Sequence, residues 1–258
     1  MPIPDAFDLS EKIALVTGAS RGIGESVARI LAAHGARVIV SSRKAEGCER
    51  VASAIRSEGG KAEARACHIG EPEQIRALMG AIETAHGRLD ILVNNAAANP
   101  YFGPIVDTDL GVFQKTVDVN IRGYFFASSL GAKLMAKNGG GSIVNVASVN
   151  GIVPGRWQGI YSITKAAVIG MTKAFAKECA AMGVRVNAIA PGATDTKFAA
   201  ALIHSEDEAI RRMTTTDVPM GRVAQPGEMA GAVLYLVSSA ASYTTGACLV
   251  VDGGYLVG

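Results

Sequence analysis

The feature that most constrains the fold lies near the N-terminus, where an apolar run passes directly into a glycine-rich turn. Ile13–Thr17 has the composition of a buried strand, residues 18–24 carry three glycines spaced G-x-x-x-G-x-G, and residues 25–34 have helical periodicity. Glycines let a pyrophosphate approach the amides of a helix N-terminus, whose partial positive charge favours an anion. The pattern predicts a dinucleotide-binding unit, although such a turn can also be a plain connection.

Further apolar runs alternate with helical patterns along the rest of the chain. They cover residues 37–41, 62–67, 89–93, 143–148, 184–190 and 248–251. This alternation predicts an α/β fold of the Rossmann type, a single domain with a doubly wound parallel sheet of seven strands and helices on both faces. Ligands of such sheets bind outside the carboxyl ends of the strands. One crevice is therefore expected to gather the residues at those ends, which are Gly18, Ser42, Ile69, Asn95, Ser148 and Pro191.

A tyrosine and a lysine four residues apart, Tyr161 and Lys165, follow one of these predicted strand ends. Positions i and i+4 share one face of a helix, so the phenol and the ammonium are expected to point into the same place. A neighbouring cation stabilises a phenolate and lowers its pKa towards a value useful for acid/base chemistry. Such pairs are common by chance on solvated helices. Here Ser148 adds a hydroxyl at a strand tip thirteen positions before the tyrosine.

Together these motifs resemble the short-chain dehydrogenase/reductase family, and the resemblance covers about residues 8–255. That family uses the glycine spacing seen here, a Ser, Tyr and Lys at this spacing, and an Asn-Asn-Ala-Gly turn that residues 94–97 match except for Ala97. The resemblance implies the strand order 3-2-1-4-5-6-7. It also implies a catalytic role for Asn120, which would face the lysine. In the family, a backbone distortion and a bound water at this position extend the proton path from the lysine to solvent.

The resemblance implies a nicotinamide dinucleotide cofactor and no metal. NAD-binding proteins place an acidic residue after the second strand, whereas an arginine accommodates the 2′-phosphate of NADP. Here Ser42 stands at that position, Arg43 follows and Arg21 lies in the glycine loop, so NADP(H) is preferred over NAD(H). The family's acidic residue after the third strand is replaced by His68, whose role is left open. The cofactor-binding residues expected are Gly18, Ser20, Arg21, Gly22, Ile23, Gly24, Ser42, Arg43, Ile69, Asn95, Ala96, Tyr161, Lys165, Pro191, Gly192, Thr194 and Thr196.

The activity that the resemblance implies is hydride transfer between the nicotinamide and a carbonyl compound or secondary alcohol. Tyr161 would act as the general acid/base, Ser148 would hydrogen-bond the reacting oxygen, and Lys165 would tune the phenol and hold the nicotinamide ribose. The alternatives are a 3-oxoacyl-[acyl-carrier-protein] reductase, an NAD-linked alcohol or sugar dehydrogenase and, more remotely, a cofactor-binding regulator without turnover. A regulator would predict a broken Ser/Tyr/Lys set, and here the set is complete.

The substrate is specified only as a small ketone, aldehyde or alcohol. We expect Asn150, Trp157, Phe198 and Leu202 to contact it, and residues 194–222 to form a helical flap over the pocket. The segments at residues 41–44, 67–70 and 99–100 resemble DHRS4-type carbonyl reductases more than 3-oxoacyl reductases. Small residues along the predicted catalytic helix, including Ala166, Gly170 and Ala174, suggest by resemblance a homotetramer, although close packing inside one chain would need the same composition.

Bulk properties argue against several other classes. A net charge of +2 with mixed signs provides no basic stripe for nucleic acid, and no apolar run reaches the 18 residues of a membrane span. Residues 1–11 lack the pattern of a secretory signal, and the four cysteines lack metal-binding or disulfide spacing. The expectation is a cytoplasmic protein with reduced thiols that acts on small molecules and binds neither nucleic acid nor membrane.

Overall fold

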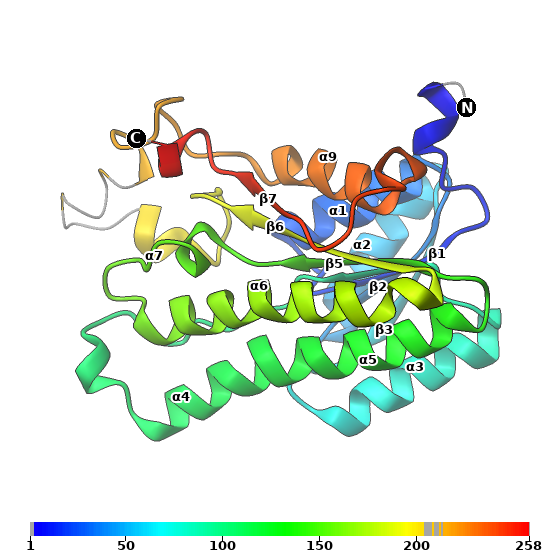
Figure 1. The fold of residues 1–258 in the computed structure, drawn as a ribbon, viewed down its shortest axis with the longest axis horizontal. Coiled ribbons are helices and arrows are strands. Elements are labelled where there is room, and N and C mark those ends of the chain that lie inside the picture. The colour runs from blue at the N-terminus through cyan, green and yellow to red at the C-terminus, as the bar shows by residue number, and fades with distance from the viewer. Residues whose placement is uncertain (1–2, 204–207, 209–211, 213, 258) are drawn as a thin grey trace.

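A computed structural model describes residues 3–203, 208, 212 and 214–257. One sheet runs through the centre of the molecule (Figure 1), and all of its strands are parallel. Its seven strands have the order β3-β2-β1-β4-β5-β6-β7. They are β1 (Ile13–Thr17), β2 (Arg37–Ser42), β3 (Lys61–Ala66), β4 (Ile91–Asn94), β5 (Gly141–Val146), β6 (Val184–Pro191) and β7 (Cys248–Val251). The predicted fold class and strand order are confirmed.

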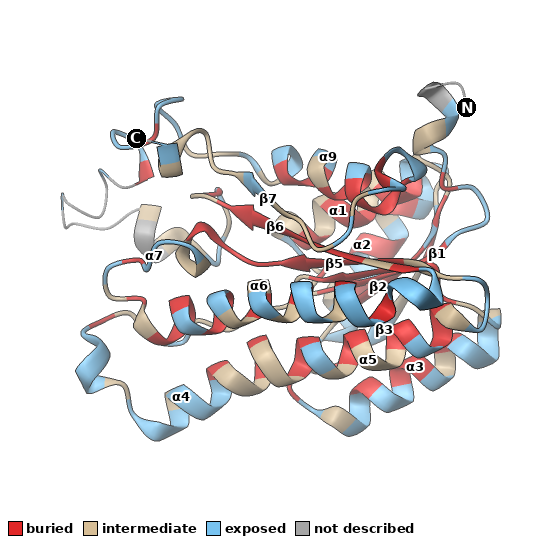
Figure 2. Ribbon diagram, in the orientation of Figure 1, coloured by how far each residue is buried: buried red, intermediate tan, exposed pale blue. Residues whose placement is uncertain are grey.

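Helices cover both faces of this sheet. One face carries α1 (Gly22–Ala33), α2 (Ala45–Ser57) and α9 (Pro226–Val237), and the other carries α3 (Pro72–His86), α5 (Tyr124–Ala136) and α6 (Gly159–Cys179), as Figure 1 shows. The central strands β1 and β4 are buried along their whole length, because both of their faces are covered. Figure 2 shows this core as a red layer between helices whose outer surfaces are exposed.

The shorter elements lie mostly around the carboxyl ends of the strands. Helix α4 (Leu110–Val117) precedes α5, and α7 (Ala200–Ile203) follows β6. Short 3₁₀ turns occur at η1 (Ile3–Phe7), η2 (Ile105–Asp107), η4 (Val149–Gly151), η5 (Ala180–Met182), η6 (Ser239–Ala241) and η7 (Tyr255–Val257). Part of the predicted flap at 194–222 falls on residues 204–207, 209–211 and 213, outside the described part of the chain.

Two helices have distinctive boundaries. A π-helical segment, η3 (Asp118–Gly123), separates α4 from α5. The last long helix, α9, begins at Pro226. Proline is favourable in the first turn of a helix, and Glu228 accepts a hydrogen bond from the Gln225 amide at 2.7 Å, which caps the helix end.

Candidate active site

A cleft of about 460 Å³ opens at the carboxyl ends of the strands. It gathers most of the residues that the sequence singled out, because the strand ends of a parallel sheet meet along one edge. Those that line it are Gly18, Ser20, Arg21, Gly22, Ile23, Ser42, Arg43, Ile69, Asn95, Ala96, Ser148, Asn150, Tyr161, Lys165, Pro191, Gly192, Thr194, Thr196 and Phe198. Gly24, Asn120 and Trp157 lie outside the lining, and the side chain of Leu202, in α7, is not among those described.

The glycine loop packs so closely on the end of β4 that larger residues would not fit. Gly18 has a φ of +64°, and a Cβ atom there would lie 2.7 Å from the Cα of Ala96. A Cβ atom on Gly24 would lie 2.5 Å from the Asn95 Nδ2, which donates to the Thr17 carbonyl at 2.9 Å. The loop therefore keeps its backbone open to the cleft at the N-terminus of α1, as binding of a pyrophosphate requires.

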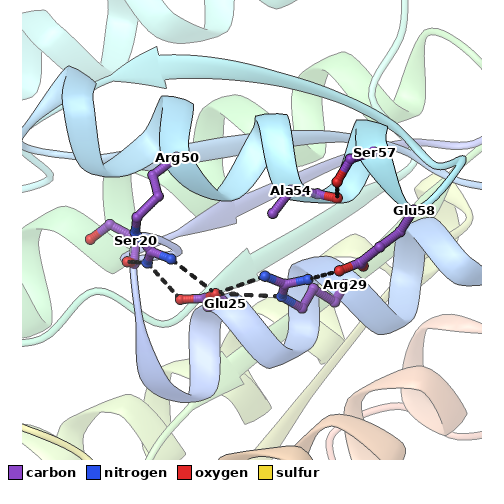
Figure 3. Close-up of polar contacts among 7 residues, drawn as sticks. All are labelled: Ser20, Glu25, Arg29, Arg50, Ala54, Ser57 and Glu58. Atoms are coloured by element: carbon purple, nitrogen blue, oxygen red, sulfur yellow. Dashed lines mark hydrogen bonds and ion pairs between the residues drawn. The ribbon is translucent and has the colours of Figure 1, made fainter.

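A polar network on the outer side of the loop holds α1 and α2 together (Figure 3). Arg50, from α2, donates to the Ser20 carbonyl at 2.7 Å and to Glu25 at 2.8 Å. Glu25 also accepts from Arg29 at 3.2 Å, and Arg29 reaches Glu58 at the end of α2. Arg50 was not among the predicted site residues, because its distance from the glycine motif in the sequence does not indicate that the two helices meet there.

The end of β2 is polar and carries positive charge. Ser20 donates to the Ser42 hydroxyl at 3.1 Å, which joins the glycine loop to the position where NAD-binding proteins carry an acidic residue. Arg21 and Arg43, which directly follow Ser20 and Ser42 in the chain, are exposed and line the same cleft. Ile69 is buried beside them, and the neighbouring His68 accepts a hydrogen bond from the Gly70 amide at its Nδ1, at 3.0 Å. This donor set fits an adenosine that carries a 2′-phosphate.

Tyr161 and Lys165 share the buried face of α6, as their spacing predicted. Lys165 is 1% exposed and donates from Nζ to the Val146 carbonyl at 2.6 Å, and its Nζ lies 5.5 Å from the centre of the Tyr161 ring. Ser148, two residues beyond β5, faces the same cleft and accepts a hydrogen bond from the Asn150 amide at 3.1 Å. The hydroxyl, the phenol and the amine thus come from two different elements.

The expected effect of Lys165 on the phenol is not what the structure shows. Burial raises the pKa of Tyr161 to about 12, and a hydrogen bond with Ser148 opposes this rise. Burial also lowers the pKa of Lys165 to about 7. Both shifts have the same cause, since a dry environment disfavours whichever form of a group is charged. The prediction of a lowered phenol pKa is therefore corrected, and Tyr161 is a protonated donor at neutral pH.

Asn120 lies behind the cleft, inside the π-helical segment. Its Oδ1 accepts from the Ala98 amide at 2.8 Å, and its Nδ2 donates to the Ala98 carbonyl at 2.9 Å and to the Thr164 hydroxyl at 3.0 Å. Thr164 directly precedes Lys165, so Asn120 links the loop after β4 to the helix that carries the tyrosine and lysine. The backbone distortion that the resemblance implied is present at this residue.

The residues expected to contact substrate have different positions. Asn150 and Phe198 line the cleft, and the Phe198 ring lies 5.9 Å from the Tyr161 ring. Trp157 instead packs edge-on against Phe102 at 5.7 Å between ring centres. This ring contact could not be predicted from the sequence, because it joins two loops that are distant in the chain.

No group of three or more His, Cys, Asp or Glu side chains in the described ranges is placed to hold a metal ion. Among the described helices, none combines the length and apolar character that crossing a membrane requires.

The chain is similar to known oxidoreductases over nearly its whole length. Residues 18–256 match the family model described as enoyl-(acyl carrier protein) reductase. The chain is 40% identical to dehydrogenase/reductase SDR family member 4 of Oryctolagus cuniculus, over 95% of this chain and 94% of that protein. It is 37% identical to cis-4-hydroxycyclohexanecarboxylate dehydrogenase of Sinomonas cyclohexanicum, over 95% and 97%. A gluconate 5-dehydrogenase from Burkholderia cenocepacia, solved with NADP and tartrate, superposes with a TM-score of 0.93 at 33% identity, covering 98% of each chain.

Proposed function

The chain belongs to the short-chain dehydrogenase/reductase family of oxidoreductases, and from this premise we propose that it transfers hydride between NADP(H) and a carbonyl compound or secondary alcohol. The observation that carries the proposal is the buried face of α6. It presents Tyr161 and Lys165 to the same cleft as Ser148, and the glycine loop opens into that cleft. A cofactor-binding regulator would not need this set.

The cofactor would be held by groups on three strand ends. The amides of the glycine loop at the start of α1 suit the pyrophosphate, and Arg21 and Arg43 suit a 2′-phosphate beside Ser42. Lys165 would hold the nicotinamide ribose, and Thr194 and Thr196 after β6 would position the nicotinamide. When bound, the nicotinamide supplies the hydride in reduction or accepts it in oxidation. The structure with NADP from Burkholderia cenocepacia supports this choice of cofactor.

The protein's own contribution is a proton and a fixed position for the reacting oxygen. With a pKa of about 12, Tyr161 is protonated at neutral pH and can donate to the alkoxide that develops during carbonyl reduction. The Ser148 hydroxyl would donate a hydrogen bond to the same oxygen. Asn120 would act as a positioning residue through Thr164. In alcohol oxidation the same phenol must first lose its proton, so the rate of oxidation should rise with pH. The direction of the reaction depends on the cofactor pool.

We also propose that the chain acts as one domain in a cytoplasmic homotetramer, with residues 194–222 as a flap over the pocket. Support for assembly comes from α6, where Ala166, Gly170 and Ala174 are exposed at intervals of four residues, and a Cβ atom on Gly170 would meet nothing within 4 Å. Small exposed residues in a row let a second helix approach closely. Light scattering of the purified protein would give the subunit number, and a monomer at micromolar concentration would contradict the proposal.

The test of the activity is a panel of ketones, aldehydes and acetoacetyl thioesters, each assayed with NADPH and with NADH. We expect reduction of ketones or aldehydes with a preference for NADPH. Strong preference for NADH would refute the proposal that Arg21 and Arg43 bind the 2′-phosphate of NADP(H). Preference for the thioesters would favour the 3-oxoacyl reductase alternative.

A matched variant tests the acid. Tyr161→Phe removes one oxygen and keeps the ring, so its affinity for NADPH, measured by fluorescence titration, should be unchanged. Its kcat should fall at least about a hundredfold, the usual contribution of general acid catalysis. Retained activity in that variant would refute the assigned acid.

A further inference from the structure

The charged side chains around the cleft are all cationic among the residues that the structure describes. They are Arg21, Arg43, Lys115, Arg156, Lys165 and Lys197, and no described Asp or Glu lines the cleft. The proposed function accounts for Arg21 and Arg43 through cofactor phosphates and for Lys165 through its place beside the phenol. It gives no role to Arg156.

Arg156 belongs to the other side of the cleft from the phosphate-binding arginines. It follows β5, whereas Arg43 follows β2, and β1 and β4 lie between these two strands. Three strand spacings separate the two ends by about 14 Å. Arg156 lies in the loop between Ser148 and Tyr161, so it belongs to the part of the cleft where the reacting oxygen would be held.

Among the described residues, the guanidinium of Arg156 has an aromatic neighbour and no counter-ion. It lies 4.8 Å from the centre of the Trp157 ring, and it forms no ion pair with any residue in the described ranges. Stacking on an aromatic ring leaves the planar edge of a guanidinium, with its N–H groups, available to a ligand. The arginine therefore presents a fork of donors at the cleft that no described carboxylate occupies.

The backbone beneath this arginine is strained. Trp157 has a φ of +61°, a conformation that a bulky aromatic residue rarely adopts. The Gly103 amide donates to the Trp157 carbonyl at 3.0 Å, and the Phe102 ring packs edge-on against the indole. Backbone strain of this kind persists where the surroundings enforce it, and such positions cluster at ligand-binding sites. The contacts fix the indole, and the indole supports the guanidinium.

We infer that Arg156 binds the carboxylate of the substrate, which makes the substrate an oxo acid or the corresponding hydroxy acid. A guanidinium matches a carboxylate with two parallel hydrogen bonds, and this gives orientation as well as affinity. Lys197, after β6, adds a second positive charge to the lining. The inference rests on the proposed oxidoreductase function and specifies its substrate class.

Binding is measured first, without turnover. Trp157 is the only tryptophan of the chain, so its emission reports directly on the group stacked against it. Oxo acids from pyruvate to 5-oxohexanoate, each paired with its methyl ester, are titrated into the protein alone and with saturating NADP⁺. We expect a saturable change in emission with at least one acid and none with its ester. If no acid gives a saturable change in either condition, the inference is overturned.

Variants then assign the effect to Arg156. Arg156→Gln should abolish the acid-dependent emission change and reduce the acid-to-ester ratio of kcat/KM about tenfold, because a hydrogen bond to a charged partner is lost. Arg156→Lys should restore part of that ratio, since it keeps the charge but loses the fork. Arg37→Gln makes the same change on an exposed arginine at the opposite edge of the sheet and should leave both measurements unchanged. An unchanged ratio in Arg156→Gln would contradict the assignment.

The outcomes separate this inference from the proposed function. Turnover of the esters with no preference for any acid overturns the carboxylate site alone. Absence of turnover with both cofactors for these acids and esters and for the whole panel of ketones, aldehydes and thioesters overturns the proposed function. The emission titration still decides whether Arg156 binds carboxylates.

Discussion

Replacing Lys165 by methionine should make the protein more stable at neutral pH. Lys165 is 1% exposed, and burial lowers its pKa from 10.5 to about 7. Above pH 10.5 the amine is neutral in the folded and unfolded chains and burial costs no ionisation energy. As the pH falls from 10.5 to about 7, the unfolded chain binds a proton that the folded chain does not, so unfolding becomes more favourable. At 1.36 kcal/mol per pH unit, the cost reaches about 5 kcal/mol near pH 7.

Methionine has a similar length and no charge, so the variant escapes this cost. It also loses the hydrogen bond to the Val146 carbonyl, which contributes about 0.5–1.5 kcal/mol, because the amine is mostly neutral in the folded protein above pH 7. The expected net gain at pH 7 is about 4 kcal/mol, and it should shrink as the pH rises and disappear near pH 10. Turnover should be lost, as stability gained at an active site commonly costs activity.

The assay is urea unfolding of the wild type and variant at pH 7, 8.5 and 10, at one protein concentration. Lys173→Met provides the control, because Lys173 is exposed on the same helix, and its change should stay within about 0.5 kcal/mol at every pH. If Lys165→Met were no more stable than the wild type at pH 7, or if its gain did not depend on pH, the reasoning from burial would be refuted.

Three further predictions follow from the site. Because burial raises the pKa of Tyr161 to about 12 and lowers that of Lys165 to about 7, only the phenol governs the pH dependence above pH 8. From pH 8 to 10 carbonyl reduction should change little, whereas kcat/KM for alcohol oxidation should rise about tenfold per pH unit; a plateau from pH 8 would contradict this. Asn120→Ala should lower the unfolding free energy by about 1–3 kcal/mol, since the partly buried amide and carbonyl of Ala98 lose their partner, and equal urea midpoints would show otherwise. Gly24→Ala should weaken NADPH binding in a fluorescence titration at least tenfold, because its Cβ would lie 2.5 Å from the Asn95 Nδ2; unchanged affinity would mean that the loop adapts.

Much of the architecture could be predicted because its signals are local. The run Ile13–Thr17 is apolar at every position since both faces of a central parallel strand are covered, and the glycines that follow it are required by close contacts with the next strand end. The pairing of Tyr161 with Lys165 was equally predictable, because four residues make about one helical turn.

Other features could not be predicted from the apolar pattern. The interruption at Asp118–Gly123 leaves no mark on the apolar periodicity, and only the family resemblance implied a backbone distortion near Asn120. The contact of the Trp157 ring with Phe102 follows from how two loops meet and not from the order of residues.

The sequence by itself therefore determined the fold class, the strand order through the family pattern, and the cleft where Ser148, Tyr161 and Lys165 gather. These depend on residue spacing along strands and helices and on the rule that parallel strand ends meet at one edge. Only the tertiary structure decided the protonation state of the phenol, the clamp of Arg50 on the glycine loop, and the place of Arg156 on the indole. Each of these depends on burial or on contact between separate elements, which exists only once the chain is packed.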